Sequence, residues 1–266
     1  MIRAARIDDM PAVRKIATRF GLLSTWCGTP DFLDAERFFG RLLLASDDAG
    51  AELGFGGTLR RGSLTHLGDL FVLPERQSSG VGRALLTDLL GHDEPRMTFA
   101  SSDPRAVALY VRHGLFPWTP LLYLKGPTAG LPKREVRPAG ADDITALDAE
   151  ASGGARHATL AWYAGLPGVA IYATDGGYAA LRRTDDEVTV GPAGGNTPQE
   201  CANAVLGALA VSPARNARIA VPGTHPLVGI LLAAGWRIAD MDTLMGDDAS
   251  RGLVHPDRYI PNPDIG

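Results

Sequence analysis

The sequence predicts an α/β protein in which a mixed sheet and its flanking helices occur in two tandem units. Three observations lead to this prediction. The chain has 266 residues, which is more than one ordinary domain needs. Strand-like and helix-like stretches alternate along its first half. A stretch rich in Gly and Pro then interrupts the pattern, and after it the pattern begins again.

Composition excludes several classes of protein. Hydrophobic content of 45% and charged content of 21% are typical of a soluble globular chain. A net charge of -4, with no long run of Lys or Arg, argues against nucleic acid as the main partner. The longest apolar run, 227–236, is shorter than the roughly 20 residues of a membrane span. Cys27 and Cys201 are too few for a disulfide framework, and the N-terminus lacks a signal-peptide pattern. We expect a cytoplasmic protein without a membrane partner.

The first two helices are predicted from their caps and their helical spacing. After a short strand over residues 2–6, Asp8 and Asp9 can cap a helix that extends to about Phe20. A second helix begins near Asp31. Its apolar residues recur at helical spacing: Phe32, Leu33, Phe38, Phe39, Leu42 and Leu43.

Turn residues divide the rest of the first half. We expect strands over residues 42–46, 51–59, 64–73, 96–101 and 115–124. A helix over 81–90 follows a loop that contains glycine. Another helix begins at Asp103-Pro104 and ends at the C-cap residue Gly114.

The second half repeats this pattern. Residues 127–133 have the composition of a linker, so we predict domains over 1–126 and 134–266. A strand over 134–137 precedes the helix-capping pair Asp142-Asp143. Late in each half, a strand, a proline turn and a helix ended by glycine recur in the same order, about 120 residues apart. This indicates an internal duplication, and the alternative is two unrelated α/β units.

A loop with two glycines lies before the third predicted helix. Because Gly80 and Gly82 have no side chain, a ligand can approach the backbone and the free N–H groups of the first helical turn. The helix dipole adds a positive potential, which suits a pyrophosphate. Arg83-Ala84 follows in place of Lys-Ser/Thr, which excludes a P-loop. Leu85 stands where a dinucleotide fingerprint has Gly or Ala, which excludes that motif.

Two motifs within residues 67–116 resemble one family. Gln77-x-x-Gly80-x-Gly82, after a strand ending in Phe71-Val72-Leu73-Pro74-Glu75, resembles the acetyl-coenzyme A signature of the GCN5-related N-acetyltransferase (GNAT) superfamily. Asp103-Pro104-Arg105-Ala106-x-x-Leu109-Tyr110-x-x-x-Gly114-Leu115-Phe116 is similar to its second motif, with Asp in place of the usual Asn and Leu115 before the phenylalanine. The resemblance implies a mixed, mostly antiparallel sheet flanked by helices in each half.

The resemblance also implies acetyl-CoA as the cofactor, with coenzyme A as product. The cofactor contacts that it implies are Leu70, Phe71, Val72, Gln77, Ser78, Ser79, Gly80, Val81, Gly82, Arg83, Asp103, Ala106 and Tyr110. Backbone groups near residues 70–72 would pair with the pantetheine arm. Tyr110 occupies the family position that protonates the departing thiolate, and a phenol with a pKa of about 10 is a reasonable donor to a thiolate.

The base that deprotonates the amine has two candidates on one strand. His66 stands where some family members carry a histidine base, and an ordinary pKa of about 6.5 suits the task. Asp69 is the other candidate, and strict alternation places it on the face opposite His66. A chain of water molecules without a single base is the third option.

The acceptor site of this fold lies between the first two helices and the far strands. Thr25, Trp26 and Phe32 are therefore expected walls, with ordinary packing as the alternative. The six histidines show no metal-ligand spacing, so we expect no metal.

The second half lacks the residues that these motifs need. Alignment of the two halves places Glu200 at the first loop glycine, and Pro198 removes a backbone N–H donor. Leucine stands at the position of Tyr110. We expect residues 134–266 to form a degenerate GNAT-like domain that binds no cofactor and packs on the first as a pseudo-dimer. Its tail, 254–266, is expected to help close the acceptor cleft.

The resemblance implies an acetyl-CoA-dependent N-acetyltransferase that transfers an acetyl group directly to a primary amine of a small molecule. A protein-directed acetyltransferase is one alternative, and a catalytically idle acyl-CoA sensor or scaffold is another. The expected assembly is a monomer with a pseudo-dimeric pair of domains, or a homodimer.

Overall fold

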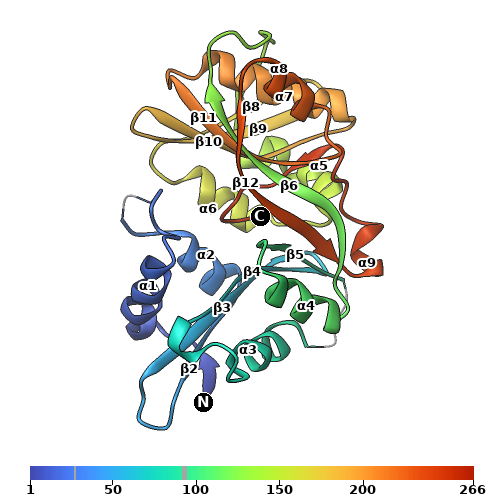
Figure 1. Ribbon diagram of the computed structural model, residues 1–266. Coiled ribbons are helices and arrows are strands. Elements are labelled where there is room, and N and C mark those ends of the chain that lie inside the picture. Colours follow the sequence, from blue (N-terminus) through green and yellow to red (C-terminus); the bar gives the residue numbers. More distant parts are fainter. Residues whose placement is uncertain (27, 92–94) are drawn as a thin grey trace.

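The computed structural model describes residues 1–26, 28–91 and 95–266, and one continuous sheet runs through both halves of the chain (Figure 1). Its strands are β1 (Ile2–Ala4), β2 (Gly40–Ser46), β3 (Glu52–Arg61), β4 (Leu64–Val72), β5 (Arg96–Ala100), β6 (Phe116–Pro127), β7 (Arg137–Ala139), β8 (Val169–Ala173), β9 (Gly177–Thr184), β10 (Glu187–Gly195), β11 (Asn216–Pro222), β12 (Arg237–Gly246) and β13 (Tyr259–Ile260). The helices are α1 (Met10–Arg19), α2 (Phe32–Phe39), α3 (Val81–Leu90), α4 (Pro104–Arg112), α5 (Ala141–Ser152), α6 (His157–Ala164), α7 (Pro198–Val211), α8 (Leu227–Ala233) and α9 (Asp248–Arg251).

The two halves exchange a strand at the centre of the sheet. The strand order is β1-β2-β3-β4-β5-β12-β6-β11-β10-β9-β8-β7, and β13 pairs with β10. Thus β12 of the second half pairs with β5, β6 of the first half pairs with β11, and the two exchanged strands pair with each other. Figure 1 shows β6 and β12 crossing together from one half to the other. The predicted boundary at residue 126 lies inside β6. Each half therefore contributes one strand to the part of the sheet that the other half forms.

The pairing pattern confirms the predicted fold class. Strands β4 and β5 run parallel, and so do β10 and β11 at the corresponding place of the second half. The other pairings that the structure describes are antiparallel. The sheet is therefore mixed and mostly antiparallel, with helices against it.

Helices bury apolar side chains on both faces of the first half's sheet. The leucines of α3 pack with Leu43 and Leu67 on one face. Helices α1 and α2 pack against Phe55 on the other face, in a core that continues into the second half through Ile144 and Leu160. This shared core and the shared sheet join the two halves.

Two predicted elements differ from the structure. Leu42 and Leu43 belong to β2 rather than to the second helix, because α2 ends at Gly40 and both leucines pair with β3. The strand predicted over 134–137 is wrong except for its last residue. This segment crosses α7 instead, where the Arg134 carbonyl and the Val136 side chain approach Gly207.

Other expectations concern cysteines and membranes. Cys201 is a buried free thiol in α7, and Cys27 lies outside the described residues. Among the helices that the structure describes, none has the length and apolar character that a membrane crossing requires.

A buried ion pair fixes the chain's last segment. Arg156 donates to both carboxylate oxygens of Asp148, with distances of 2.9 Å from Nε and 2.8 Å from Nη2. Both side chains are at most 1% exposed. Arg156 also donates to the Gly266 carbonyl at 2.7 Å and to the Tyr259 hydroxyl at 3.0 Å, and the Tyr178 hydroxyl donates to Asp148. The pair therefore holds α5, β9 and residues 259–266 together.

The substitution Asp148→Ala is expected to lower the free energy of unfolding by about 3–5 kcal/mol, because it leaves the Arg156 guanidinium buried without its counter-charge. Urea unfolding followed by circular dichroism measures this loss. The matched control is Asp142→Ala on the same helix, where the carboxylate is 94% exposed and the change should stay within about 0.5 kcal/mol. Equal stability of the two variants would show that the buried pair does not support the fold.

Candidate functional site

The first candidate site is a cleft of about 290 Å³ between α3, α4 and the end of β4. We call it the α3–α4 cleft. It is lined by Leu70, Val72, Gln77, Ser78, Gly80, Gly82, Arg83, Asp103, Arg105, Ala106, Leu109, Tyr110 and Arg112. Helix α4 is positioned by Asp103, whose side chain accepts from the Arg105 N–H at 2.9 Å, and by Pro104 in the first turn. Most cofactor contacts implied by the two motifs thus lie around one cleft.

The start of α3 presents free backbone donors to this cleft. Gly80 has a φ of +89°, a conformation that side-chain-bearing residues rarely adopt, and a Cβ there would meet nothing within 4 Å. The first helical bond joins the Ala84 N–H to the Gly80 carbonyl at 3.0 Å, and no side chain caps the helix. The N–H groups of residues 81–83 therefore have no helical partner and can bind an anion.

The edge of β4 beside this cleft is open. Pairing between β4 and β5 covers residues 65–67 of β4 and then stops, so the two strands separate. From Asp69 onward no described strand pairs with this edge, although the Gln77 side chain donates to the Val72 carbonyl at 3.2 Å. The backbone here can pair with an extended ligand.

Three implied cofactor contacts lie elsewhere. The Phe71 ring points to the opposite face of the sheet, where it lies 5.0 Å from the Phe20 ring and 5.8 Å from the Phe55 ring. The Ser79 hydroxyl donates to the Arg76 carbonyl, and neither Ser79 nor Val81 lines the α3–α4 cleft. Because the side chain of Phe71 points to the opposite face of the sheet, only its backbone groups can contact a ligand in the α3–α4 cleft.

Tyr110 lies on α4 at the inner end of the α3–α4 cleft and is 7% exposed. Burial raises the pKa of its hydroxyl, and the nearby charges of Asp69 and Asp242 raise it further. The phenol therefore keeps its proton at neutral pH and is able to donate it.

The second candidate site is a cavity of about 520 Å³ between the two halves, which we call the inter-half cavity. The first half contributes Thr25, Phe32 and Asp69, and the second half contributes Asp242 and Asp264. Pro263 beside Asp264 also lines it, so part of the chain's tail forms one wall of this cavity. The tail is the segment that the sequence predicts to help close the acceptor cleft.

Trp26 lines a neighbouring pocket instead of this cavity. Its indole N–H donates to Asp264 at 3.0 Å, and its ring lies under the Arg182 guanidinium at 4.0 Å. Trp26 therefore holds Asp264 in place, and Thr25 and Phe32 are the predicted walls that reach the inter-half cavity.

A bulge in β4 brings Asp69 to this cavity. Gly57 of β3 pairs with Asp69, and the next residue, Thr58, pairs with Leu67, so Gly68 is an extra residue. The bulge reverses the alternation beyond it. The prediction that His66 and Asp69 lie on opposite faces is therefore wrong.

His66 lies deep in the core on the same face as Asp69. It is 1% exposed, its ring packs on Phe99 at 4.6 Å, and its Nδ1 lies 3.5 Å from Nη2 of Arg61. Burial and the charges of Arg61 and Arg156 hold its pKa well below the ordinary value. His66 lines neither the α3–α4 cleft nor the inter-half cavity.

Glu36 of α2 is the partner of Asp69, and the sequence reasoning missed it. Its side chain is fully buried, and neither carboxylate oxygen accepts from a donor in the described chain. A Cβ on Gly57 would lie 1.7 Å from Oε2 of Glu36, and one on Gly68 would lie 2.5 Å from Oε1, so these two glycines make its pocket. The signal in the sequence was an acidic residue on the apolar face of a predicted helix.

The position of the two carboxyls favours one proton held between them. Burial raises the pKa of Asp69 to about 7, and burial together with the charge of Asp69 raises the pKa of Glu36 well above its ordinary value. Two adjacent buried carboxylates cannot both be ionised at low cost. A protonated Glu36 can donate to Asp69, which leaves Asp69 as the proton acceptor that faces the cavity.

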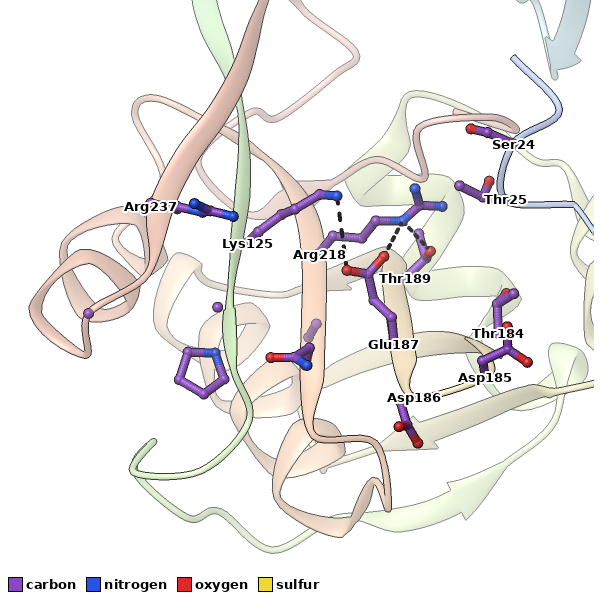
Figure 2. Close-up of a pocket in the computed structure, with 15 residues that line it drawn as sticks. Ser24, Thr25, Lys125, Thr184, Asp185, Asp186, Glu187, Thr189, Arg218 and Arg237 are labelled. Atoms are coloured by element: carbon purple, nitrogen blue, oxygen red, sulfur yellow. Dashed lines mark hydrogen bonds and ion pairs between the residues drawn. The ribbon is translucent and has the colours of Figure 1, made fainter. Parts of the chain in front are cut away.

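A more open pocket of about 690 Å³ adjoins the inter-half cavity and shares four lining residues with it, namely Ser24, Thr25, Lys125 and Arg218. Figure 2 shows the Lys125 and Arg218 side chains directed at Glu187, at 4.0 Å and 3.7 Å. Within the described ranges, no group of three or more His, Cys, Asp and Glu residues is arranged to hold a metal ion.

The corresponding helix start of the second half is closed. Helix α7 begins at Pro198, and the Thr197 hydroxyl accepts from the Glu200 N–H at 3.2 Å. The Glu200 carboxylate packs against Gly176, where a Cβ would lie 2.2 Å from Oε1. Leu231 and Leu232 of α8 are the two candidates for the position of Tyr110, and neither carries a hydroxyl. These side chains occupy the space that an anion would need.

The shared proton predicts how stability depends on pH. The folded state binds protons on Glu36 and Asp69 that the unfolded state loses above about pH 4. The free energy of unfolding therefore falls as pH rises from about 4 through about 7. The substitution Glu36→Gln removes one titrating group and should raise Tm at pH 8 by about 2–4 °C, with a smaller gain near pH 4.5. Thermal unfolding from pH 4.5 to 8 measures this, with the exposed Glu135→Gln as control. A pH-independent difference would contradict the shared proton.

Comparisons with known proteins agree with this geometry. The family model described as an acetyltransferase (GNAT) domain matches residues 35–120, which include both the α3–α4 cleft motifs and Asp69. No curated protein matches the chain. A putative acetyltransferase from Pyrococcus horikoshii has 17% identity and a TM-score of 0.77, over 100% of this chain and 95% of its own.

Other solved structures have the same fold in both halves. A tandem GNAT protein from the clavulanic acid biosynthesis pathway has 16% identity and a TM-score of 0.60, over 94% of this chain and 98% of its own. A GCN5-related N-acetyltransferase from Kribbella flavida has 17% identity and a TM-score of 0.60, over 92% of this chain and 71% of its own. Residues 35–120, which hold both motifs, therefore match a GNAT acetyltransferase domain, and the chain as a whole has the fold of these acetyltransferase structures.

Proposed function

We propose that the chain is an acetyl-CoA-dependent N-acetyltransferase that acts on a primary amine of a small molecule, with both ligands bound at once. The observation that carries this proposal is the position of Tyr110. Its side chain lines the α3–α4 cleft together with Leu70 of β4, and the preceding residue of that strand, Asp69, lines the inter-half cavity. A proton donor thus lines the cleft at the strand segment that both sites share.

The α3–α4 cleft fits acetyl-CoA. The free N–H groups of residues 81–83 suit the pyrophosphate, and the open β4 edge suits the pantetheine arm. Arg83 and Arg112 line the cleft, and neither forms an ion pair with an acid in the described part of the chain, so both can pair with phosphate. When bound, acetyl-CoA supplies the thioester whose acetyl group passes to the amine nitrogen with release of the thiol.

The chain's own residues move the protons. Asp69, beside the buried Glu36 carboxyl, accepts the proton that the amine nitrogen loses. Its pKa of about 7 suits a base that works near neutral pH. The Tyr110 hydroxyl donates a proton to the leaving sulfur. One proton is taken up and one is delivered, so the chain's net charge is unchanged after proton exchange with solvent.

The lining of the inter-half cavity supports a small acceptor rather than a protein side chain, because residues of both halves and of the tail form its walls. The Asp69–Glu36 pair supports turnover rather than an idle sensor, because a binding module has no use for a buried, protonated carboxyl pair. We also propose that residues 134–266 bind no cofactor, on the evidence of the closed α7 start.

Calorimetric titration with acetyl-CoA tests the cofactor site and the second half together. We expect one acetyl-CoA per chain. Gly82→Asp should abolish binding, because it adds a carboxylate beside the pyrophosphate. Gly82→Ala should keep it, since a Cβ there would touch Val72 at an ordinary 3.5 Å. Two bound ligands per chain, or unchanged affinity in Gly82→Asp, would refute this assignment.

Removal of the Tyr110 hydroxyl tests the chemistry separately. We expect Tyr110→Phe to lower kcat by about 10–1000-fold while the Kd for acetyl-CoA stays the same, because the lost group acts on the leaving sulfur. Steady-state thiol release and the same titration measure both quantities. Wild-type kcat in this variant would remove Tyr110 from the mechanism.

A further inference from the structure

We propose that the acceptor carries two positive charges, as in a small diamine or polyamine, with its reacting amine at Asp69 and its second ammonium group at Asp242 and Asp240. This inference rests on the proposed function and names the substrate class of the same site.

The first argument is the balance of charge in the inter-half cavity. Asp69, Asp240 and Asp242 all line it, and in the described part of the chain none of the three forms an ion pair with a basic side chain. Asp69 is 7% exposed, and a carboxylate so deeply buried normally has a cationic partner. The three acids therefore face the cavity without protein counter-charges.

The two basic residues of the same cavity share one carboxylate outside it. Lys125 and Arg218 are directed at Glu187, and Arg218 also donates from Nε to the Thr189 hydroxyl at 2.7 Å (Figure 2). The remaining acid, Asp264, pairs with Arg182 at 3.3 Å. Lys125 and Arg218 carry one positive charge more than Glu187, against the three carboxyl groups of Asp69, Asp240 and Asp242, so the charge left over in the cavity is negative.

The other walls suit an alkyl chain that carries ammonium groups. Phe32, Phe71 and Phe99 line the cavity and offer aromatic faces, which attract cations and pack against methylene groups. Tyr123 also lines it, and its hydroxyl donates to Oδ2 of Asp242 at 2.8 Å. That hydrogen bond orients the carboxylate and leaves Oδ1 for a ligand.

The second half therefore selects the acceptor that the first half acetylates. Asp240 and Asp242 belong to β12, the strand that crosses into the first half's sheet, and Asp240 pairs with Tyr123 in register. Burial and the charge of Asp240 raise the pKa of Asp242 above its ordinary value, in keeping with a carboxylate that lacks a cation. A second ammonium group would supply that cation.

Matched amines test the inference. With acetyl-CoA and the full chain at pH 8, thiol release is measured for α,ω-diamines of three to six carbons, for the monoamines of the same lengths, and for the ω-amino acids that replace the second amine by a carboxylate. We expect kcat/KM for the best diamine to exceed that of its monoamine by about tenfold or more, and the zwitterion to be the poorest. Asp242→Asn should reduce the ratio of diamine to monoamine about tenfold. The control Asp48→Asn, at an exposed turn, should leave this ratio unchanged.

Equilibrium binding separates this inference from the proposed function. Calorimetry with the same diamines should show binding that weakens in Asp242→Asn. Diamine binding without acetylation of any amine would overturn the proposed function and support the dicationic site. Acetylation of monoamines or zwitterions as well as diamines would keep the proposed function and overturn the inference, and so would absence of binding and turnover for every diamine.

Discussion

Pairing of β6 with β12 at the centre of the sheet is the constraint on which the rest of the structure depends. Without the exchange, the edges of β5 and β11 would expose unpaired backbone groups, and neither half would have a complete sheet. The exchange also carries Asp240 and Asp242 of β12 to the face on which the first half holds Asp69. A cavity lined from both halves therefore exists only when both have folded together.

The bulge at Gly68 links backbone geometry to acid–base chemistry. One extra residue turns Asp69 toward the cavity, and the missing side chains of Gly57 and Gly68 leave the volume that the Glu36 carboxyl fills. A lone buried carboxylate is costly, so this arrangement favours one proton held between Glu36 and Asp69. The same burial that raises both pKa values gives Asp69 the proton affinity of a base. Local packing thus favours Asp69 over His66 as the base, because Arg61 and Phe99 pack against the His66 ring and it lines neither described cavity.

What could be predicted from the sequence was mostly local. The turn at Gly80 and the helix starts at Asp31 and Asp103 follow from residues within a few positions of each other, and the structure has them. Contacts between distant residues could not be derived in this way. The exchange of β6 and β12, the bulge that puts Asp69 on the same face as His66 and the approach of Glu36 depend on which strands meet in space. Alternation in a strand holds only while no residue is added, and the sequence marks a bulge by no more than a glycine.

The two halves resolve one physical conflict in opposite ways. A helix start that binds an anion must leave its first N–H groups without protein partners, and omission of a cap costs about 0.5–2 kcal/mol. Helix α3 lacks this stabilisation, since Gly80 precedes it and no side chain caps it. Helix α7 avoids that cost, because Thr197 accepts from the Glu200 N–H and Glu200 fills the space beside Gly176. In the function that we propose, the first half holds the cofactor, and the second half buries its helix start and contributes strand β12, whose carboxylates line the inter-half cavity. The capped start of α7 and the acidic residues of β12 thus give the second half a different part in the proposed site from that of the first.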